Sequence, residues 1–475
     1  MSDCVYTLRK AELLMFNSLD DTITAISTAQ VPAGIGIVRI SGTDAVNIAD
    51  KLYHGKNGKV LSEQKGNTVH YGMIVKDGKP LDEVLVMLLR APHSYTGEDT
   101  VEIDCHGGIL AVNRVLEAVL DSGARLAEPG EFTKRAYLNG RIDLSQAEAV
   151  MDLISAKSEY ALESSLSQLK GSLHNAITDI RDELLSRLAF IESALDDPEH
   201  YSLDGYGGEL SPVIADLKKK ITGLIETSVQ GKYIEEGIST VILGKPNAGK
   251  SSLLNMMTGI DRAIVTDIPG TTRDVLKETI QLGGVALKLV DTAGIRRSDD
   301  IVEQIGVNMA KDEAAGADLI LYVVDTSSML DENDLEILSM VEGKKVIVLL
   351  NKSDLSDKKI KREDLEKICS HEIIETSALS GRGIERLKEK IKEMFFSGGL
   401  SFNDEVYITN VRHKKALEEA KVSLENVEEA LRDGIPEDVY SIDIFGAIMT
   451  LDTIIGGDVS EDLVNTIFEK FCMGK

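Results

Sequence analysis

Apolar residues recur with different periods along the chain, and the period indicates where domains begin and end. Between residues 20 and 139, short apolar runs are separated by glycine turns. Residues 35–40 and 83–89 are predicted strands, and residues 111–120 are a predicted helix. We therefore expect an α+β domain over residues 20–139. Residues 1–19 fit no such pattern, and we interpret them as a flexible extension.

A helical pattern begins near residue 140. Leu184, Leu188, Ile191 and Leu195 are three or four positions apart, which places them on one face of a helix. An acidic break over residues 196–208 separates two helical stretches. The helical pattern returns after residue 398 and continues to residue 475. We therefore expect one helical domain in two parts, residues 140–235 and 399–475.

The region between these two parts alternates strands with helices. Apolar runs at residues 318–324 and 346–350 have the length of buried strands, and helical spacing follows them. This alternation is typical of a parallel, doubly wound sheet. We predict that residues 236–398 form an α/β domain inserted into the helical domain, so the fold class is α/β plus helical.

Composition narrows the class of protein. The 475 residues carry a formal net charge of −27 and include no Trp. This charge disfavours nucleic-acid binding spread over the whole surface, because phosphate contacts need clustered Lys and Arg. The four cysteines, at positions 4, 105, 369 and 472, have no metal-ligand spacing. No apolar run has the length of a membrane span, and no signal-peptide pattern is present, so we expect a cytoplasmic protein without membrane contact.

The sequence GKPNAGKS, from Gly244 to Ser251, is a complete phosphate-binding loop. It follows an apolar strand-like run and precedes a predicted helix, which is the context that this motif requires. We expect the loop amides to surround a β-phosphate and Lys250 to bridge the β- and γ-phosphates. The Ser251 hydroxyl would bind Mg²⁺. The loop by itself leaves ATP and GTP as alternatives.

Two further motifs complete the nucleotide site, and the second of them selects guanine. Asp291 to Gly294 (DTAG) follows an apolar strand and would reach the Mg²⁺ and the γ-phosphate. Asn351 to Asp354 (NKSD) follows another strand, and Asp354 can accept hydrogen bonds from the guanine N1–H and N2–H₂. Asn351 would brace the loop, and Ser377-Ala378 would contact the guanine O6. Three motifs in this order predict a Ras-like P-loop GTPase domain.

The predicted catalytic machinery of this domain lacks one common part. Thr272, in a switch segment of sequence GTTRD, is placed to complete the Mg²⁺ shell. Ile295 stands where many regulatory GTPases have a Gln that orients the attacking water. Another group must replace that Gln, and the nearby acids are Asp299, Asp300 and Glu303. Asn247 could hold a monovalent cation against the phosphates, or it could simply fill the loop.

The loop with Asn247, the GTTRD switch, the missing Gln and the FCMGK tail together resemble the MnmE (TrmE) family of tRNA modification GTPases. The resemblance covers residues 20–475. Its most specific blocks are IGIVRISG at 35–42, YTGEDTVEIDCHGG at 95–108, PGEFTKRAYLNGRIDL at 129–144 and QAEA at 146–149.

This resemblance implies a function and a partner set. Family members form homodimers through a folate-binding N-terminal domain and act with the flavoprotein MnmG. Together they install a carboxymethylaminomethyl or aminomethyl group at C5 of the wobble uridine of certain tRNAs, using methylenetetrahydrofolate. By motif match, the folate contacts are Arg39, Glu102, Arg141 and Lys475. Arg141 departs from the Lys of some members but keeps the positive charge.

The resemblance also assigns roles within the G domain. K⁺ would be bound by Asn247, Thr266, Ile268 and Thr271, with Mg²⁺ at Ser251 and Thr272, and Glu303 would orient the attacking water. Lys250 and Thr272 join Glu303 as the catalytic set, and Cys472 is a candidate nucleophile whose alternative role is packing of the tail. The remaining predicted GTP contacts are Ala248, Gly249, Ser252, Asp267, Pro269, Gly270, Asp291, Thr292, Ala293, Gly294, Asn351, Lys352, Asp354, Ser377 and Ala378.

Two other functions fit parts of the sequence. A ribosome-assembly GTPase would have a similar G domain, but an RNA-binding module usually follows it, whereas this chain has a folate-type N-terminal domain and the CMGK tail. A one-carbon transfer enzyme regulated by its G domain is the second alternative. Methylene transfer to tRNA uridine by the isolated protein would favour that alternative.

Overall fold

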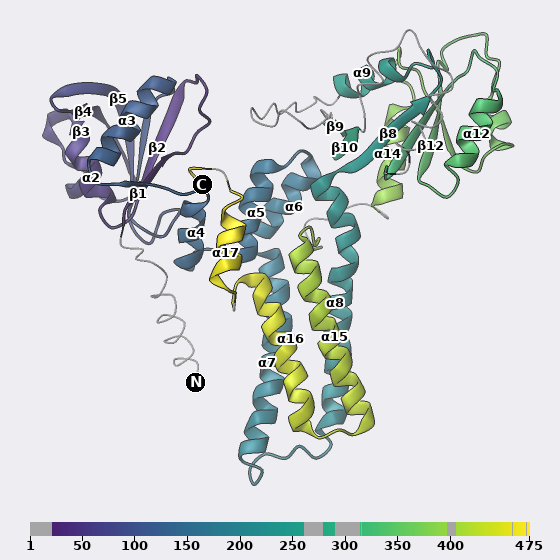
Figure 1. Ribbon diagram of the computed structural model, residues 1–475. Coiled ribbons are helices and arrows are strands. Elements are labelled where there is room, and N and C mark those ends of the chain that lie inside the picture. The colour runs from purple at the N-terminus through teal and green to yellow at the C-terminus, as the bar shows by residue number, and fades with distance from the viewer. Residues whose placement is uncertain are drawn as a thin grey trace. The chain divides into compact units, whose positions relative to one another are not determined.

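The computed structural model describes residues 21–260, 279–289, 314, 316–396, 405–457, 459–471 and 473–475 (Figure 1). It divides into two compact units. The N-terminal unit comprises Met1–Met151 and Asp452–Lys475, and the central unit comprises Asp152–Leu451. The last part of the chain therefore belongs to the same unit as the first part, although 300 residues separate them in sequence.

The N-terminal unit is built on a mostly antiparallel sheet of order β3-β4-β5-β6-β2-β1-β7, in which β1 and β7 alone are parallel among the described pairs. The strands are β1 (Ile23–Ile26), β2 (Ile35–Ser41), β3 (Tyr53–Gly55), β4 (Thr68–Lys76), β5 (Lys79–Leu89), β6 (Thr100–His106) and β7 (Arg125–Leu126). Two short 3-10 turns, Lys56–Gly58 and Leu61–Glu63, follow β3. The strands predicted at 35–40 and 83–89 are thus confirmed.

Helices cover one face of this sheet. They are α2 (Ala45–Leu52) and α3 (Ile109–Asp121), the latter confirming the helix predicted at 111–120. Val38 and Ile103 point to the same side as these helices and are fully buried in the core with them. Because side chains alternate along a strand, Arg39 and Glu102 lie on the opposite face. The sheet therefore separates an apolar core from a charged face.

The N-terminal unit is completed by helices from both ends of the chain, α4 (Glu131–Leu138), the first turns of α5 (Leu144–Ser155) and α17 (Glu461–Phe468). Leu144, Val464 and Phe468 are buried in one apolar cluster. Gly130, directly before α4, could not be a larger residue without strain. Its φ is +71°, and an added Cβ would lie 2.6 Å from the Phe468 carbonyl oxygen.

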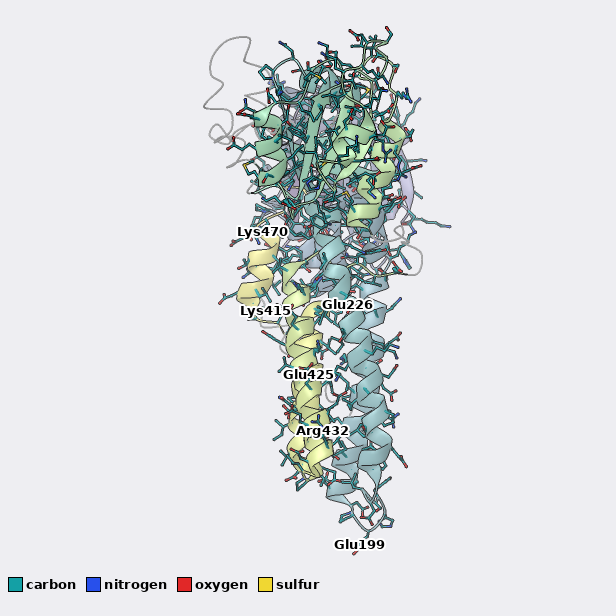
Figure 2. The ribbon with its side chains drawn as sticks, turned by 90° about the vertical axis from the view of Figure 1, so that its right-hand side faces the viewer. Glu199, Glu226, Lys415, Glu425, Arg432 and Lys470 are labelled. Carbon is teal, nitrogen blue, oxygen red and sulfur yellow. The ribbon has the colours of Figure 1, made fainter. Side chains whose placement is uncertain are left out.

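The helical part of the central unit contains long antiparallel helices (Figures 1 and 2). They are α7 (Ser172–Asp196), α8 (Tyr206–Glu236), α15 (Val411–Asp433) and most of α16 (Glu437–Ile455), and the shorter α6 (Glu159–Leu169) precedes α7. Leu184, Leu188 and Ile191 are buried as their spacing predicted, whereas Leu195 is exposed in the last turn of α7. Charged side chains such as Glu425 and Arg432 line the outside of α15 (Figure 2). The helical prediction is confirmed.

The inserted α/β domain, predicted over residues 236–398 and called the G domain below, has a six-stranded sheet of order β13-β12-β11-β8-β10-β9. The strands are β8 (Ile238–Gly244), β9 (Thr279–Leu282), β10 (Val285–Leu289), β11 (Leu319–Asp325), β12 (Val346–Asn351) and β13 (Glu372–Glu375). All described pairs are parallel except β9 with β10, an antiparallel edge that the sequence analysis did not foresee.

Helices lie on both faces of this sheet, as the doubly wound prediction required. Residues of α9 (Lys250–Ile260) and α14 (Ile384–Phe395) share one core with β8 and β10. Residues of α12 (Glu332–Met340) and α13 (Arg362–Glu366) pack in a second core. The carboxyl ends of β8 and β12 lead into the predicted nucleotide motifs. Among the helices that the structure describes, none combines the length and the apolar character needed to cross a membrane.

Candidate functional site

The phosphate loop joins β8 to α9 through residues that need glycine. Gly244 has φ +146°, and an added Cβ would lie 2.4 Å from the Val323 carbonyl oxygen. Gly249 has φ +95°, and its added Cβ would lie 2.3 Å from Nδ2 of Asn351. Asn247 adopts φ +64°, a left-handed conformation that Asn tolerates better than most residues. The loop is therefore a compact backbone cradle, with the Asn247 side chain exposed.

Lys250 places a partly buried positive charge in this cradle. Its Nζ donates to the carbonyl oxygens of Gly244, at 2.5 Å, and Lys245, at 2.8 Å. Burial lowers the pKa of the Lys250 ammonium. Within the part of the chain that the structure describes, its hydrogen-bond partners are these two neutral carbonyls. A partly buried cation at the start of a helix, with no anionic partner among the described residues, fits a bound phosphate.

Asn351 connects the phosphate loop to the predicted base-recognition loop. Its Nδ2 donates to the Ala248 carbonyl oxygen at 2.9 Å. Its Oδ1 accepts from the Ala378 amide at 3.3 Å and from the Thr376 hydroxyl at 3.5 Å. The side chain is almost fully buried. One amide group therefore fixes the distance between the loop that would hold phosphates and the loop that would hold the base.

Asp354 and Lys352 follow Asn351 at the carboxyl end of β12. The hydrogen bond from the Ser377 side chain lowers the pKa of Asp354, whose carboxylate is exposed. An ionised, accessible carboxylate is the acceptor that the paired N–H groups of guanine require. Lys352 has φ +60°, and its Nζ lies 2.6 Å from Oδ2 of Asp325. This ion pair holds the NKSD loop against the end of β11.

Sequence reasoning missed one anchor of the phosphate loop. The Nζ of Lys245 lies 2.7 Å from an Asp331 carboxylate oxygen and 2.5 Å from one of Asp334. The Tyr322 hydroxyl donates to the other Asp334 oxygen at 2.5 Å. Asp331 and Asp334 form the capping box at the start of α12. The D-x-x-D spacing before an apolar run was the available signal, because it marks a helix start that can face the loop.

A second constellation lies on the charged face of the N-terminal sheet. Arg39 on β2 and Glu102 on β6 are directly opposite in the register, and Arg39 Nε lies 2.7 Å from Glu102 Oε1. The Arg39 guanidinium is 5.5 Å from the ring centroids of both Tyr95 and Phe132. Asp104 lies two residues beyond Glu102 on the same face, and burial raises the pKa of its carboxyl. Its Oδ1 is buried without a hydrogen-bond partner among the described residues.

Arg141 and the tail meet this constellation. The Arg141 guanidinium lies 5.4 Å from the Tyr95 ring centroid and donates to the Tyr95 carbonyl oxygen at 3.0 Å. The Gly474 carbonyl oxygen accepts from Arg39 at 3.4 Å, and the Lys475 carbonyl oxygen accepts from the Phe132 amide at 3.2 Å. The structure therefore brings the four predicted folate contacts to one region of the N-terminal unit.

Tyr95 and Phe132 are additions to the residues predicted for this region. Both lie inside the sequence blocks that carry the family resemblance, YTGEDTVEIDCHGG and PGEFTKRAYLNGRIDL. Position alone did not show that these two rings flank the same guanidinium, since 36 residues separate them in sequence and only the fold brings them together.

A buried ion network supports this face from behind. Arg135 on α4 is 2% exposed and pairs with Asp21 at 2.5 Å, Glu98 at 3.2 Å and Glu131 at 3.1 Å. Arg125 adds a second guanidinium, 2.6 Å from Glu131. Burial alone would raise the pKa of Glu131, but the hydrogen bond from Arg125 and the charge of Arg135 outweigh it, so the pKa is lowered. The network fixes α4, which carries Phe132.

Several predicted site residues lie outside the residues that the structure describes. They are Thr266, Asp267, Ile268, Pro269, Gly270, Thr271, Thr272, Asp291, Thr292, Ala293, Gly294, Glu303 and Cys472. Ser251 and Ser252 lie in the first turn of α9.

Comparison with known proteins identifies the family. The chain matches the family model of the MnmE helical domain over residues 144–472 and that of the GTP-binding protein TrmE N-terminus over residues 22–141. A tRNA modification GTPase MnmE from Lachnoclostridium phytofermentans is 55% identical over 96% of this chain and 99% of its own length. Those of Bacillus velezensis and Bacillus subtilis are 47% identical, over 96% of this chain and at least 99% of their own length. By these matches and by the geometry described above, the chain belongs to the MnmE family of tRNA modification GTPases.

Proposed function

We propose that this protein hydrolyses GTP to GDP and phosphate, and that it uses this cycle in the modification of wobble uridines in tRNA. The main support for GTP as the substrate is the position of the Asn351 side chain. It is hydrogen-bonded to the phosphate loop that contains Lys250, and it lies in the same NKSD motif as Asp354. The relatives named tRNA modification GTPase match 96% of this chain, which supports the second half of the proposal.

The chemistry of hydrolysis follows from charge placement. Lys250 and the loop amides bind the phosphates, and Ser251 and Thr272 would hold a Mg²⁺ that neutralises phosphate charge. K⁺, held by Asn247, Thr266, Ile268 and Thr271, would take the place of an arginine finger. The exposed side chain of Asn247, on a loop that Lys245 anchors, supports its part in this set. Glu303 would orient the attacking water, since the apolar Ile295 cannot.

The side chains on the charged face of the N-terminal unit have the chemistry needed to bind methylenetetrahydrofolate. A pterin is a planar ring with N–H donors, and a carboxylate such as that of Glu102 can accept hydrogen bonds from them. The rings of Tyr95 and Phe132 offer flat apolar surfaces against which the pterin could pack. The guanidinium of Arg141 can pair with the carboxylates of a folate tail. A bound folate would supply the one-carbon unit, while Arg39 and the tail residue Lys475 position it.

The partner set includes a second copy of this chain, the flavoprotein MnmG and tRNA, in the cytoplasm. Val69 and Tyr71 on β4 and Leu85 on β5 lie on the sheet face opposite α2 and α3 and are 57%, 50% and 45% exposed. Three apolar residues on one sheet face support a protein contact there, and the homodimer is the contact that we propose. GTP binding and hydrolysis would close and open the paired G domains.

Mass spectrometry of wobble uridines tests this function. In cells that lack the protein, we expect the aminomethyl-type groups at C5 to disappear from the affected tRNAs. Expression of the wild-type chain should restore them, whereas Lys250→Ala and Arg39→Ala should not. Arg187→Ala, which alters a partly exposed ion pair on α7, is the matched control and should restore them fully. Unchanged uridines in the deletion strain would contradict the proposal.

A further inference from the structure

The β9–β10 hairpin lies, in sequence, between the predicted GTTRD switch segment and the DTAG motif. β9 begins five residues after Asp274, the end of the GTTRD segment, and β10 ends at Leu289, two residues before Asp291 of the DTAG motif. β10 pairs with β8 along residues 287–289, so the hairpin is part of the same sheet as the phosphate loop. A shift of either segment with the bound nucleotide would therefore reach this hairpin through a few peptide units.

The tip of the hairpin contacts helix α6 through the backbone. The Gly284 carbonyl oxygen accepts from the Tyr160 amide at 3.2 Å. The amides in the first turn of a helix have no partner within the helix, so this bond satisfies one of them. The Gln281 side chain donates to the Lys157 carbonyl oxygen at 3.0 Å, just before the Ser158 cap. Two bonds thus attach the hairpin to the start of α6.

The Tyr160 side chain makes this attachment tight. A Cβ added at Gly284 would lie 3.2 Å from the Tyr160 ring, and the Gly284 φ of +87° favours glycine as well. The ring stands edge-on to Phe396 at a centroid separation of 5.9 Å, and the Lys392 ammonium lies 5.4 Å from its centroid. Tyr160 therefore packs against the hairpin tip and the end of α14 together.

The far end of α6 is held by the helical bundle. Gln168 is buried, and its Nε2 donates to the Tyr407 carbonyl oxygen and to the Thr409 hydroxyl, both at 3.2 Å. The amide of Ile408, in the same segment, donates to the Thr227 hydroxyl of α8 at 3.1 Å. α6 is thus fixed to the hairpin at its first turn and to the bundle at its last.

We propose that the β9–β10 hairpin relays the nucleotide state of the G domain to α6, and that Tyr160 is the positioning residue that receives it. A packed strand and a packed helix move as rigid elements, so a displacement at the switch end of β10 reaches the first turn of α6. The chain continues backwards from α6 through residues 156–158 into α5. The relay rests on the proposed GTP cycle and does not depend on tRNA chemistry.

Hydrogen exchange of the full-length protein tests the relay, with GDP compared with a non-hydrolysable GTP analogue. In the wild type, we expect amide exchange in α6 to differ at least about threefold between the two nucleotides. Tyr160→Ala should remove this difference while the α9 peptide next to the phosphate loop still responds. Tyr160→Phe keeps the ring and should preserve the response, and Tyr201→Ala, an exposed tyrosine in the 197–205 loop, is the control.

Gln281→Leu provides a second variant in case Tyr160→Ala does not fold, because it removes one exposed hydrogen bond and should reduce the α6 response. A full α6 response in both Tyr160→Ala and Gln281→Leu, or none in the wild type while α9 responds, would overturn the relay. If α9 were also indifferent to the nucleotide in the wild type, the GTP cycle itself would fail, and the relay with it.

Discussion

The two candidate sites of this protein are assembled in opposite ways. The nucleotide site uses loops at the carboxyl ends of parallel strands, and each loop is a short continuous stretch of sequence. Many of its contacts come from backbone groups around Lys250 and Asn351. The site in the N-terminal unit uses side chains from distant points in the sequence, Arg39, Glu102, Arg141 and the tail, gathered on the face of an antiparallel sheet. A site built from loops can be recognised as a motif in the sequence. A site on a sheet face becomes apparent only when the fold brings its side chains together.

The largest effect should come from the ion network behind the sheet-face site. Arg135→Leu leaves the carboxylates of Asp21, Glu98 and Glu131 without their central cation, which should lower the free energy of unfolding of the N-terminal unit by about 3–5 kcal/mol. Urea titration measures this change. The partly exposed Arg187–Glu183 pair is the control, and Arg187→Leu should cost at most about 1 kcal/mol.

Acid should narrow the difference between Arg135→Leu and the wild type. The pKa values of Glu131 and Asp21 are lowered in the folded state, so their stabilising contribution is complete above the ordinary carboxyl pKa and is lost as pH falls through the lowered values. The stability gap should shrink between about pH 5 and pH 3. A gap that does not change with pH would show that packing, and not charge, determines the effect.

Lys250→Ala should nearly abolish nucleotide binding by the loop site. The ammonium would donate to two phosphates, and two charge-assisted hydrogen bonds correspond to about 3 kcal/mol, or roughly 150-fold in the dissociation constant of GTP. Fluorescent GTP titration measures it. Lys245→Ala disrupts only the anchor to α12, so it should retain most of the affinity. Equal losses in the two variants would mean that loop rigidity, rather than the Lys250 charge, binds the phosphates.

The cation dependence of hydrolysis should be the next largest effect. GTP turnover in K⁺ should exceed that in Na⁺ by about 100-fold, the size of the effect expected for one preorganised charge at the transition state. Asn247→Gly keeps the left-handed backbone that φ +64° requires but removes the amide oxygen. In this variant the two rates should converge. A preserved K⁺ preference would exclude Asn247 from the cation site.

Base selectivity should respond to a single carboxylate. Asp354→Asn replaces one acceptor oxygen of the carboxylate by an NH₂ donor, which suits the C2 carbonyl of xanthine rather than the C2 amino group of guanine. We therefore expect GTP affinity to fall about 30-fold and xanthosine triphosphate to become the better ligand. Competition between the two nucleotides measures the switch. Asp357→Asn, an exposed acid three residues further on, is the matched control and should leave GTP affinity unchanged.

The smallest effect should come from the tail. Gly474→Ala places a Cβ 2.2 Å from the Ile26 carbonyl oxygen at φ +87°, which would displace the tail from Arg39. We expect folate affinity, measured by calorimetry, to fall about tenfold while GTP affinity is unchanged. Gly434→Ala is the control, since Gly434 also has a positive φ but nothing within 4 Å of an added Cβ. Equal loss of folate affinity in both variants would indicate a general backbone effect.

Much of the fold followed from periodicity, and its omissions have a physical cause. The helices around Leu184 and Leu188 and the strands at 35–40 and 346–350 were predicted because one face or both faces are buried without interruption. The edge strand β9 was not predicted, because four residues beside a glycine turn carry too little pattern. Its antiparallel pairing with β10 is a tertiary fact.

The sequence by itself determined which chemistry is present: a phosphate loop, a guanine motif and a family-specific set of charged residues. The phosphate loop and the guanine motif are readable because each is a short continuous stretch of sequence, and the charged residues are readable because each lies in a family-specific block. Tertiary structure decided what those residues contact, because packing sets distances between residues far apart in the chain. It placed Asn351 between two loops, Tyr95 and Phe132 around Arg39, and the last residues of the chain against Phe132.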